Sequence, residues 1–219
     1  MARASSISLA SEMTPNEQAA LVEIIRERAL PGKHLEIGTA AGGTLCQMML
    51  AARHQPRFVV VDTLKYFPNQ RETVLNNLTA HGLPAERVEI REATSAEAYR
   101  QAYQAGDRFD FILVDGSHKF FYVMQDLRWA RCLNRQGILA LHDYSPKFPG
   151  VEQPVNYFLA RNPGYRKLML ADSLLILEKA EDDPPTDVVT MPPILARLVH
   201  LKLQIQKSLQ KRFGHSRPA

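Results

Sequence analysis

Two short stretches of the chain carry side chains that can do chemistry. The first, Val-Asp-Gly-Ser-His, contains Asp115 and His118, and the second, Leu-His-Asp-Tyr, contains His142 and Asp143. Two carboxylates and one imidazole form a donor set that suits Mg²⁺ and also tolerates manganese, iron or zinc. An imidazole can also take a proton from a hydroxyl group, which makes His118 the first candidate for a general base and His142 the second. Both ideas require the two stretches to meet in the fold.

Another candidate site lies at residues 35–44, Leu-Glu-Ile-Gly-Thr-Ala-Ala-Gly-Gly-Thr, where an apolar strand runs into a turn that opens a helix. The glycines at positions 38, 42 and 43 remove the Cβ atoms that would keep a ligand off the main chain, and they let the turn adopt φ values that other residues resist. Glu36 leaves a carboxylate at the strand end, which is a poor host for pyrophosphate, and Ala40 stands where the dinucleotide fingerprint requires its second glycine. The turn therefore favours a cationic, phosphate-free nucleoside such as S-adenosylmethionine.

Asp62 supports a nucleoside site because it ends the next apolar strand, 20 residues after Gly42. At this place a carboxylate can accept hydrogen bonds from both ribose hydroxyls. An exposed acid at a strand end would give the same residue, but the order of strand, glycine turn and acid favours the binding interpretation.

The elements around these motifs are expected to bring them to one edge of a sheet. Apolar strand-like runs alternate with helical patterns, which predicts a parallel, doubly wound sheet with helices on both faces. The expected strands are residues 34–37, 58–61, 88–90, 109–114 and 138–141. A helix over residues 15–30 precedes them. Residues 165–170 and 173–177 predict a hairpin at the edge of the sheet.

Taken together, the motifs resemble those of class I S-adenosylmethionine-dependent methyltransferases. The turn matches the Glu-Ile-Gly-Thr-x-x-Gly-Gly form of their first motif. The later segments Phe-Asp-Phe-Ile-Leu-Val-Asp-Gly-Ser-His and Gly-Ile-Leu-Ala-Leu-His-Asp-Tyr resemble the group with macrocin-type sugar O-methyltransferases and cephalosporin-hydroxylase-like proteins. The resemblance covers residues 33–179 and implies an α/β, Rossmann-like, mostly parallel seven-stranded sheet with an antiparallel edge hairpin, followed by a C-terminal helix.

The resemblance also implies how S-adenosylmethionine would be held. Glu36 would meet its methionine amino group, and Asp62 its ribose. The other candidate cofactor-binding residues lie in the turn, at the strand ends and at a later helix start: Gly38, Thr39, Ala40, Gly42, Gly43, Thr44, Thr63, Leu64, Thr94, Ser95, Asp115 and Gly116. Thr94 could instead be a helix N-cap, or serve both purposes.

Resembling enzymes hold magnesium with acids at these strand ends. This chain differs because His142 stands where the related pattern often has a second acid, so the predicted metal site is Asp115, His142 and Asp143, with Mg²⁺ or Mn²⁺ as the candidate ion. Adjacent strand-end acids also occur without a metal. His118 could likewise be a solvent-facing residue at a helix start.

The function that the resemblance implies is O-methylation of a small hydroxylated molecule, such as a sugar or a glycosylated metabolite. The protein would align donor and acceptor, and a metal or a base would deal with the hydroxyl proton; Asp115, His118 and His142 are the catalytic candidates. An NAD-dependent reductase, which Asp62 would also suit, and a non-enzymatic membrane-surface or scaffold module are the alternatives.

Composition and charge distribution set the remaining expectations. The hydrophobic fraction is 45%, no apolar run approaches the roughly 20 residues of a membrane span, and the N-terminus does not resemble a secretory signal, which predicts cytoplasmic residence. The net charge of +4 comes from residues 195–219, which hold six Lys or Arg and no acid. Because the excess positive charge is confined to these C-terminal residues, it does not imply nucleic-acid binding.

Four segments are expected: an N-terminal segment and helix (1–32), the methyltransferase domain (33–179), an acidic proline-rich linker (180–193) and a basic amphipathic helix (194–219). The last helix could pack on the domain, pair in a homodimer or contact a membrane surface.

Overall fold

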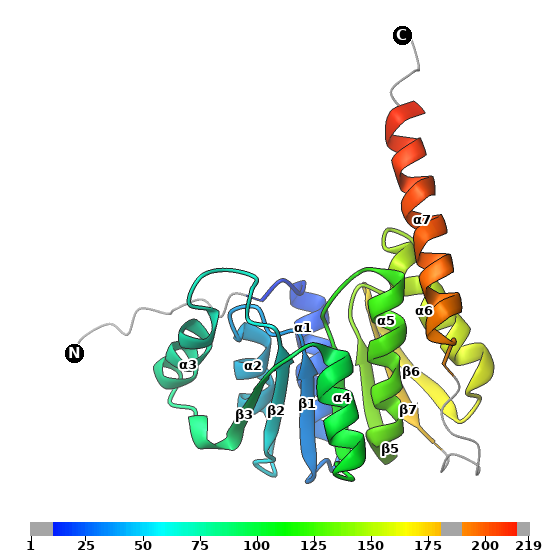
Figure 1. Cartoon of the computed structure of the whole chain (residues 1–219). Coiled ribbons are helices and arrows are strands. Elements are labelled where there is room, and N and C mark those ends of the chain that lie inside the picture. Colours follow the sequence, from blue (N-terminus) through cyan, green and yellow to red (C-terminus); the bar gives the residue numbers. More distant parts are fainter. Residues whose placement is uncertain (1–10, 181–189, 214–219) are drawn as a thin grey trace.

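The computed structural model describes residues 11–180 and 190–213, and it centres on one seven-stranded sheet in the order β3-β2-β1-β4-β5-β7-β6 (Figure 1). The strands are β1 Lys33–Ile37, β2 Phe58–Asp62, β3 Val88–Glu92, β4 Phe109–Val114, β5 Leu133–Leu141, β6 Tyr165–Ala171 and β7 Leu174–Lys179. The first five pair in parallel, and β7 pairs antiparallel with both β5 and β6. The predicted mostly parallel sheet with an edge hairpin is confirmed.

Helices cover both faces of this sheet. The α-helices are α1 Pro15–Glu27, α2 Gly43–Ala51, α3 Gln70–Ala80, α4 Ser95–Gln104, α5 Phe120–Asp126, α6 Pro149–Arg161 and α7 Pro193–Phe213, and the 3-10 helices are η1 Ala85–Arg87 and η2 Leu127–Cys132. One apolar core lies between the sheet and α1, α2 and α3, and the other lies under α4, α5, α6 and the start of α7. Both faces of the central strands are therefore buried, which explains their continuous apolar sequences.

Among the strands and the first helix, two boundaries differ from the predicted ones by three residues or more. The first helix starts at Pro15 as expected, but it ends at Glu27 because Arg28 already has an extended backbone. Strand β5 begins at Leu133 rather than at Ile138, since Leu133 pairs with Phe109 before an irregularity shifts the register. The polar residues within that irregularity break the apolar run by which a strand is recognised in the sequence.

The C-terminal helix is confirmed as α7, and it runs alongside α5 and then past the sheet (Figure 1). Most of the predicted linker lies outside the described residues, as do residues 1–10 and 214–219, so the four-segment division stays a prediction. Over the described ranges, no helix is at once long and apolar enough to cross a membrane.

The order of the strands places the candidate site. Strands β1 and β4 are neighbours, and the chain proceeds from them towards opposite edges of the sheet. In an open α/β sheet, ligands bind outside the carboxyl ends of the strands where the strand order reverses in this way. The glycine turn after β1 and the Asp115 stretch after β4 both lie at that point.

Candidate active site

The turn after β1 is held in shape by three residues with left-handed backbone, Gly38, Ala40 and Gly42. A Cβ on Gly38 would lie 2.2 Å from the carbonyl oxygen of Asp115, and one on Gly42 would lie 3.2 Å from a methyl carbon of Val74. The expectation that these glycines make room for a ligand is therefore corrected at Gly38, where backbone takes the space, while a Cβ on Gly42 would be in tight contact with Val74. The positive φ of both glycines agrees with the expected backbone freedom. Gly38 lets the ends of β1 and β4 meet backbone to backbone.

Glu36 is fully buried beneath this turn, and neither of its carboxyl oxygens has a hydrogen-bond partner among the described residues. Burial raises the pKa of Glu36 to about 8; the nearby hydroxyl of Thr39 opposes this shift, and the charges of Asp115 and Asp62 reinforce it. The hydroxyl of Thr39, in the same turn, is also buried without a partner in the described part of the chain. Buried polar atoms are normally satisfied, so these three oxygens fit a cationic amino group of a ligand.

Asp62 ties the ends of β1 and β2 together. Its carboxylate accepts hydrogen bonds from the backbone amides of Thr39, at 2.9 Å, and Leu64, at 2.6 Å. Thr63, which lies between Asp62 and Leu64 in the sequence, is exposed, and Leu64 is half-buried with a positive φ. A carboxylate has about four acceptor sites, so Asp62 can hold the turn and still accept from ribose hydroxyls.

Helix α3 supplies two residues that the sequence analysis missed. The side-chain amide of Gln70 donates to the carbonyl oxygen of Ala40, and that of Asn77 donates to the carbonyl oxygen of Ala41. They satisfy backbone groups in a turn that has no regular secondary structure. No sequence motif marks them, since an amide on a helix is as often exposed to solvent.

At the start of α2, Gly43 and Thr44 are both buried, and the Thr44 hydroxyl lies 2.9 Å from that of Ser11. These two predicted residues therefore belong to the same turn region. The hydroxyl of Ser11 is a partner that the sequence analysis did not identify.

Two other predicted cofactor-binding residues, Thr94 and Ser95, lie at the start of α4. Thr94 is the N-cap and forms a capping box with Glu97, so that possibility is confirmed. The hydroxyl of Ser95 accepts a hydrogen bond from the indole of the fully buried Trp129. Nearby, burial raises the pKa of Asp126 to about 7.

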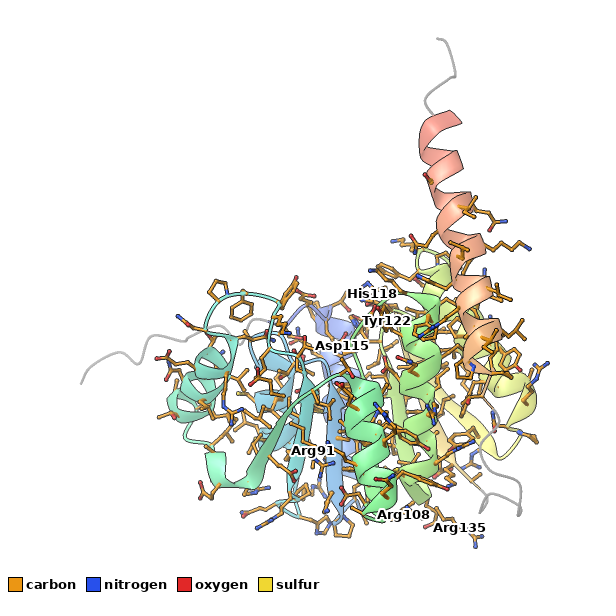
Figure 2. All side chains as sticks on the ribbon, in the orientation of Figure 1. Arg91, Arg108, Asp115, His118, Tyr122 and Arg135 are labelled. Carbon is orange, nitrogen blue, oxygen red and sulfur yellow. The ribbon has the colours of Figure 1, made fainter. Side chains whose placement is uncertain are left out.

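The chemistry-bearing stretches do meet, at the carboxyl ends of β4 and β5. The Nδ1 atom of His142 lies 2.7 Å from Asp115 and 3.3 Å from Asp143, and the Nε2 atom of His118 lies 2.6 Å from Asp143. A small cavity beside them is lined further by Val114, Leu141 and Val151, and by the predicted Gly116. Figure 2 shows Asp115 and His118 at the same edge of the molecule, the edge opposite Arg108 and Arg135.

Glu17 joins this cluster from helix α1, a contact that the sequence analysis missed. One carboxyl oxygen accepts from the backbone amide of Thr14 and lies 3.3 Å from His142 Nε2, while the other accepts from the amide and hydroxyl of Ser173. The capping box of α1 explains its position at the first turn, but no local pattern predicts contact with a residue 125 positions away. Glu17 thus links α1, the edge hairpin and the end of β5.

The charges in this cluster are strongly coupled. Burial alone would lower the pKa of His142, but Asp115 and Asp143 raise it to about 11. Burial likewise works against ionisation of Asp143, but the contacts with His118 and His142 hold its pKa well below the usual range. The bond to Asp143 raises the pKa of His118. The cluster therefore favours protonated histidines, with a carboxylate at each nitrogen of His142, and either histidine must release a proton before it can bind a metal ion or accept a proton.

The same residues can hold a metal ion. Asp115, His142 and Asp143 each offer one ligand atom, and these atoms lie within 4.8 Å of one another. Ligands at neighbouring corners of an octahedral Mg²⁺ or Mn²⁺ site lie about 3 Å apart, close to the separations between His142 and the two acids. The Glu17 contact also matches the carboxylate that usually orients a metal-binding histidine through its second nitrogen. The donor set therefore fits a divalent cation.

The fold and the arrangement of the site define a class, that of α/β proteins built like the class I S-adenosylmethionine-dependent methyltransferases. Residues 35–144 match the model of a family described as a methyltransferase domain, and the chain belongs to that family. The predicted resemblance is confirmed at this level. A search of curated proteins found no match to the chain.

Solved structures with the same fold include several O-methyltransferases. One is an O-methyltransferase from Bacillus cereus in complex with S-adenosylhomocysteine, at 16% identity and a TM-score of 0.63, covering 77% of this chain and 82% of that one. Another is the TDP-rhamnose 3′-O-methyltransferase CalS11, at 18% identity and a TM-score of 0.60; the match covers 75% of this chain and 77% of that one. A third is the O-methyltransferase TomG from Streptomyces achromogenes in complex with S-adenosylmethionine, at 18% identity and a TM-score of 0.56; the match covers 78% of this chain and 81% of that one.

Proposed function

We propose that this protein transfers the methyl group of S-adenosylmethionine to a hydroxyl group of a small molecule, with a sugar or a glycosylated metabolite as the favoured acceptor class. The observation that carries the proposal is the meeting of two features at one edge of the sheet: the unsatisfied Glu36 under the glycine turn and the acid and imidazole cluster after β4 and β5. The methyltransferase-domain match favours this function over an NAD-dependent reductase.

When bound, the cofactor would supply a methyl group on a sulfonium whose leaving group is already activated. Glu36 would accept hydrogen bonds from its ammonium group, because two buried carboxyl oxygens without partners in the described part of the chain are a strong acceptor for a cation. Asp62 would hold the ribose hydroxyls while keeping its bonds to Thr39 and Leu64. These contacts would fix the donor at the ends of β1 and β2, and catalysis of an in-line displacement depends first on such alignment.

The acceptor hydroxyl would lie by Asp115, next to the cofactor turn. The amide of Asp115 donates to the carbonyl oxygen of Ile37, so the end of β4 is fixed directly against that turn. A divalent ion held by Asp115, His142 and Asp143 would lower the pKa of a coordinated hydroxyl. Both nitrogens of His142 lie by carboxylates, which argues for a ligand or positioning role. His118, half-exposed beside the cavity, is the better placed proton acceptor.

The choice of a sugar as acceptor is supported by analogy of fold and by the aromatic side chains at the site. CalS11 is an O-methyltransferase of TDP-rhamnose, a nucleotide-linked sugar, and the sequence resemblance to sugar O-methyltransferases points the same way. Phe148 packs on His118 with ring centroids 4.9 Å apart, and an aromatic ring in this place suits contact with a sugar ring. Hydroxylated sugars and their nucleotide-linked forms therefore head the list of acceptors to screen.

Calorimetric titration with S-adenosylmethionine and with NAD tests the cofactor, and we expect binding of the first alone. A panel of hydroxylated acceptors, with S-adenosylhomocysteine formation as the readout, tests the reaction. Binding of NAD without S-adenosylmethionine would contradict the proposal.

Chelation tests the metal separately. Enzyme treated with EDTA should lose activity and regain it with Mg²⁺ or Mn²⁺, and the Asp115→Asn variant should lose that response. Full activity after chelation would contradict the metal-assisted reaction and leave His118 as the proton acceptor.

A further inference from the structure

Helix α7 has two apolar faces, and only one of them is covered within the described part of the chain. On the inner face Ala196 is buried, and Val199 and Leu203 pack against the core beneath α5. The opposite face carries an aliphatic row that is 52–78% exposed: Ile194, Leu198, Leu201 and Ile205, which we call the outer stripe. Their spacing of four, three and four residues places them on one side of the helix. A surface helix normally needs only one apolar face, so the outer stripe requires its own explanation.

Charge limits what can cover the outer stripe. The helix, residues 193–213, contains five Lys or Arg and no Asp or Glu. By helical geometry, Arg197 lies on one flank of the stripe and Lys202 on the other. Both residues are exposed, and the Arg197 guanidinium lies 5.1 Å from the ring centroid of Phe121 on α5. An aliphatic row with a cation on each flank complements a surface that is apolar inside and anionic at its boundary.

Pairing with a second copy through this stripe is electrostatically unfavourable. If the stripe formed the seam of a parallel coiled coil, Arg197 and Lys202 would occupy the g and e positions that face each other across the interface. Antiparallel pairing would set the same residues against other positions of a helix that contains no acid. Like charges at these positions oppose association, so a homodimer through α7 is not the arrangement that the sequence favours.

We propose that the outer stripe of α7 lies on the surface of an anionic lipid bilayer. The four aliphatic side chains would enter the boundary between headgroups and acyl chains, and Arg197 and Lys202 would meet the lipid phosphates and carboxylates. This attachment is independent of the proposed methyl transfer. Because α7 continues past the sheet edge that carries Asp115 and His118, it would hold that edge beside the membrane surface (Figures 1 and 2).

The test is co-sedimentation of the full chain with vesicles of phosphatidylcholine containing ~30% phosphatidylserine, and with pure phosphatidylcholine vesicles. We expect binding to the anionic vesicles that weakens as salt is raised, and little binding to the neutral ones. The double variant Leu198→Gln and Leu201→Gln keeps the charge of the helix and should bind about tenfold more weakly or worse. The matched control is Leu50→Gln, which changes an equally exposed leucine on α2 and should bind like the wild type.

Three results would overturn the proposal. One is failure of the wild type to bind anionic vesicles, and another is equal binding by the double variant. The third is a wild-type dimer that the double variant converts to a monomer in light scattering, without vesicle binding, because a second copy would then cover the stripe. S-adenosylmethionine binding by the double variant, measured in the same preparation, shows that its fold is intact and separates this test from that of the enzymatic function.

Discussion

The two halves of the candidate site satisfy their charged groups in opposite ways. At the cofactor half, Glu36 is buried with no partner among the described residues, and its pKa is raised. At the reaction half, each nitrogen of His142 lies next to a carboxylate, and His118 lies next to Asp143. The first half gains a partner when a cationic ligand binds, whereas the second must exchange existing contacts before it can hold a metal or accept a proton.

This difference indicates that the cofactor half determines cofactor affinity, whereas the reaction half determines the rate of the reaction together with the stability of the fold. An unpartnered buried carboxyl destabilises the free protein and strengthens binding of a cation, so Glu36 should couple folding stability to cofactor affinity. A network that is already paired gives stability to the free protein, so changes there should affect the reaction and the fold together. Substitutions in the two halves can separate these effects.

The largest effect is expected for Asp143→Asn. The substitution keeps the shape of the side chain but removes the charge that contacts both His118 and His142. We expect the rate of S-adenosylhomocysteine formation to fall about 10²- to 10⁴-fold, the usual contribution of a positioned acid–base group. Calorimetry on the same sample should still show S-adenosylmethionine binding. Near-normal turnover would mean that the cluster is structural.

Glu36→Gln should have two effects of opposite sign. Loss of the charged acceptor should weaken cofactor binding roughly 10- to 100-fold, which corresponds to a charge-assisted hydrogen bond of about 1.5–3 kcal/mol. The same substitution should stabilise the cofactor-free protein at high pH, because it removes a buried group that must ionise there.

The pH dependence follows from the raised pKa of Glu36, about 8 in the folded protein against 4.5 for an unperturbed glutamate. Its stabilising contribution is complete below about pH 4.5 and is lost as the pH rises towards 8, since the unfolded chain releases this proton first. The loss is at most about 5 kcal/mol. Urea unfolding at pH 5, 6.5 and 8 should therefore show the wild type losing stability relative to Glu36→Gln. If the unfolding free energies of the two proteins change equally with pH, Glu36 is ionised in both the folded and the unfolded protein, which contradicts the raised pKa.

A smaller effect, roughly tenfold in turnover, is expected for Glu17→Gln. Glutamine at this position can still complete the capping box of α1, so the helix keeps its start, but the carboxylate beside His142 is gone. Glu97→Gln is the matched control, because Glu97 has the same capping-box position on α4 and lies outside the cluster. Equal turnover in both variants would limit Glu17 to a structural role, whereas Mg²⁺ dependence that shifts only in Glu17→Gln would support positioning of His142.

The parts of this site that the sequence predicted are those fixed by local pattern and by topology. Alternating strands and helices gave the parallel sheet, and the rule for parallel strands then placed Asp115, His142 and Asp143 together. Thr94 could be recognised as an N-cap because its partner Glu97 lies three residues away. In each case the information lies within a few residues or follows from the order of the strands.

The parts that could not be predicted depend on how separate elements dock. Glu17 reaches His142 only because α1 packs beside the edge hairpin, where Ser173 holds its carboxylate. One of the two reasons for Gly38 was also wrong: its φ is positive as expected, but the atom that excludes a Cβ belongs to Asp115, far along the chain, and not to a ligand. Such contacts leave no periodicity in the sequence, because each depends on a single pair of distant residues.

The smallest effect is expected for Thr94→Ala, which tests whether Thr94 is only the N-cap of α4 or also contacts the cofactor. Its hydroxyl accepts from the amide of Glu97 and donates to the Glu97 carboxylate, so it has no further proton to offer a ligand. Thr94→Ala should therefore cost about 1 kcal/mol of unfolding free energy and leave S-adenosylmethionine affinity unchanged. Thr14→Ala, at the equivalent capping box of α1, provides the control for a cap away from the turn. If Thr94→Ala weakens cofactor binding while Thr14→Ala does not, the hydroxyl of Thr94 contacts the ligand, and the cofactor half extends to the start of α4.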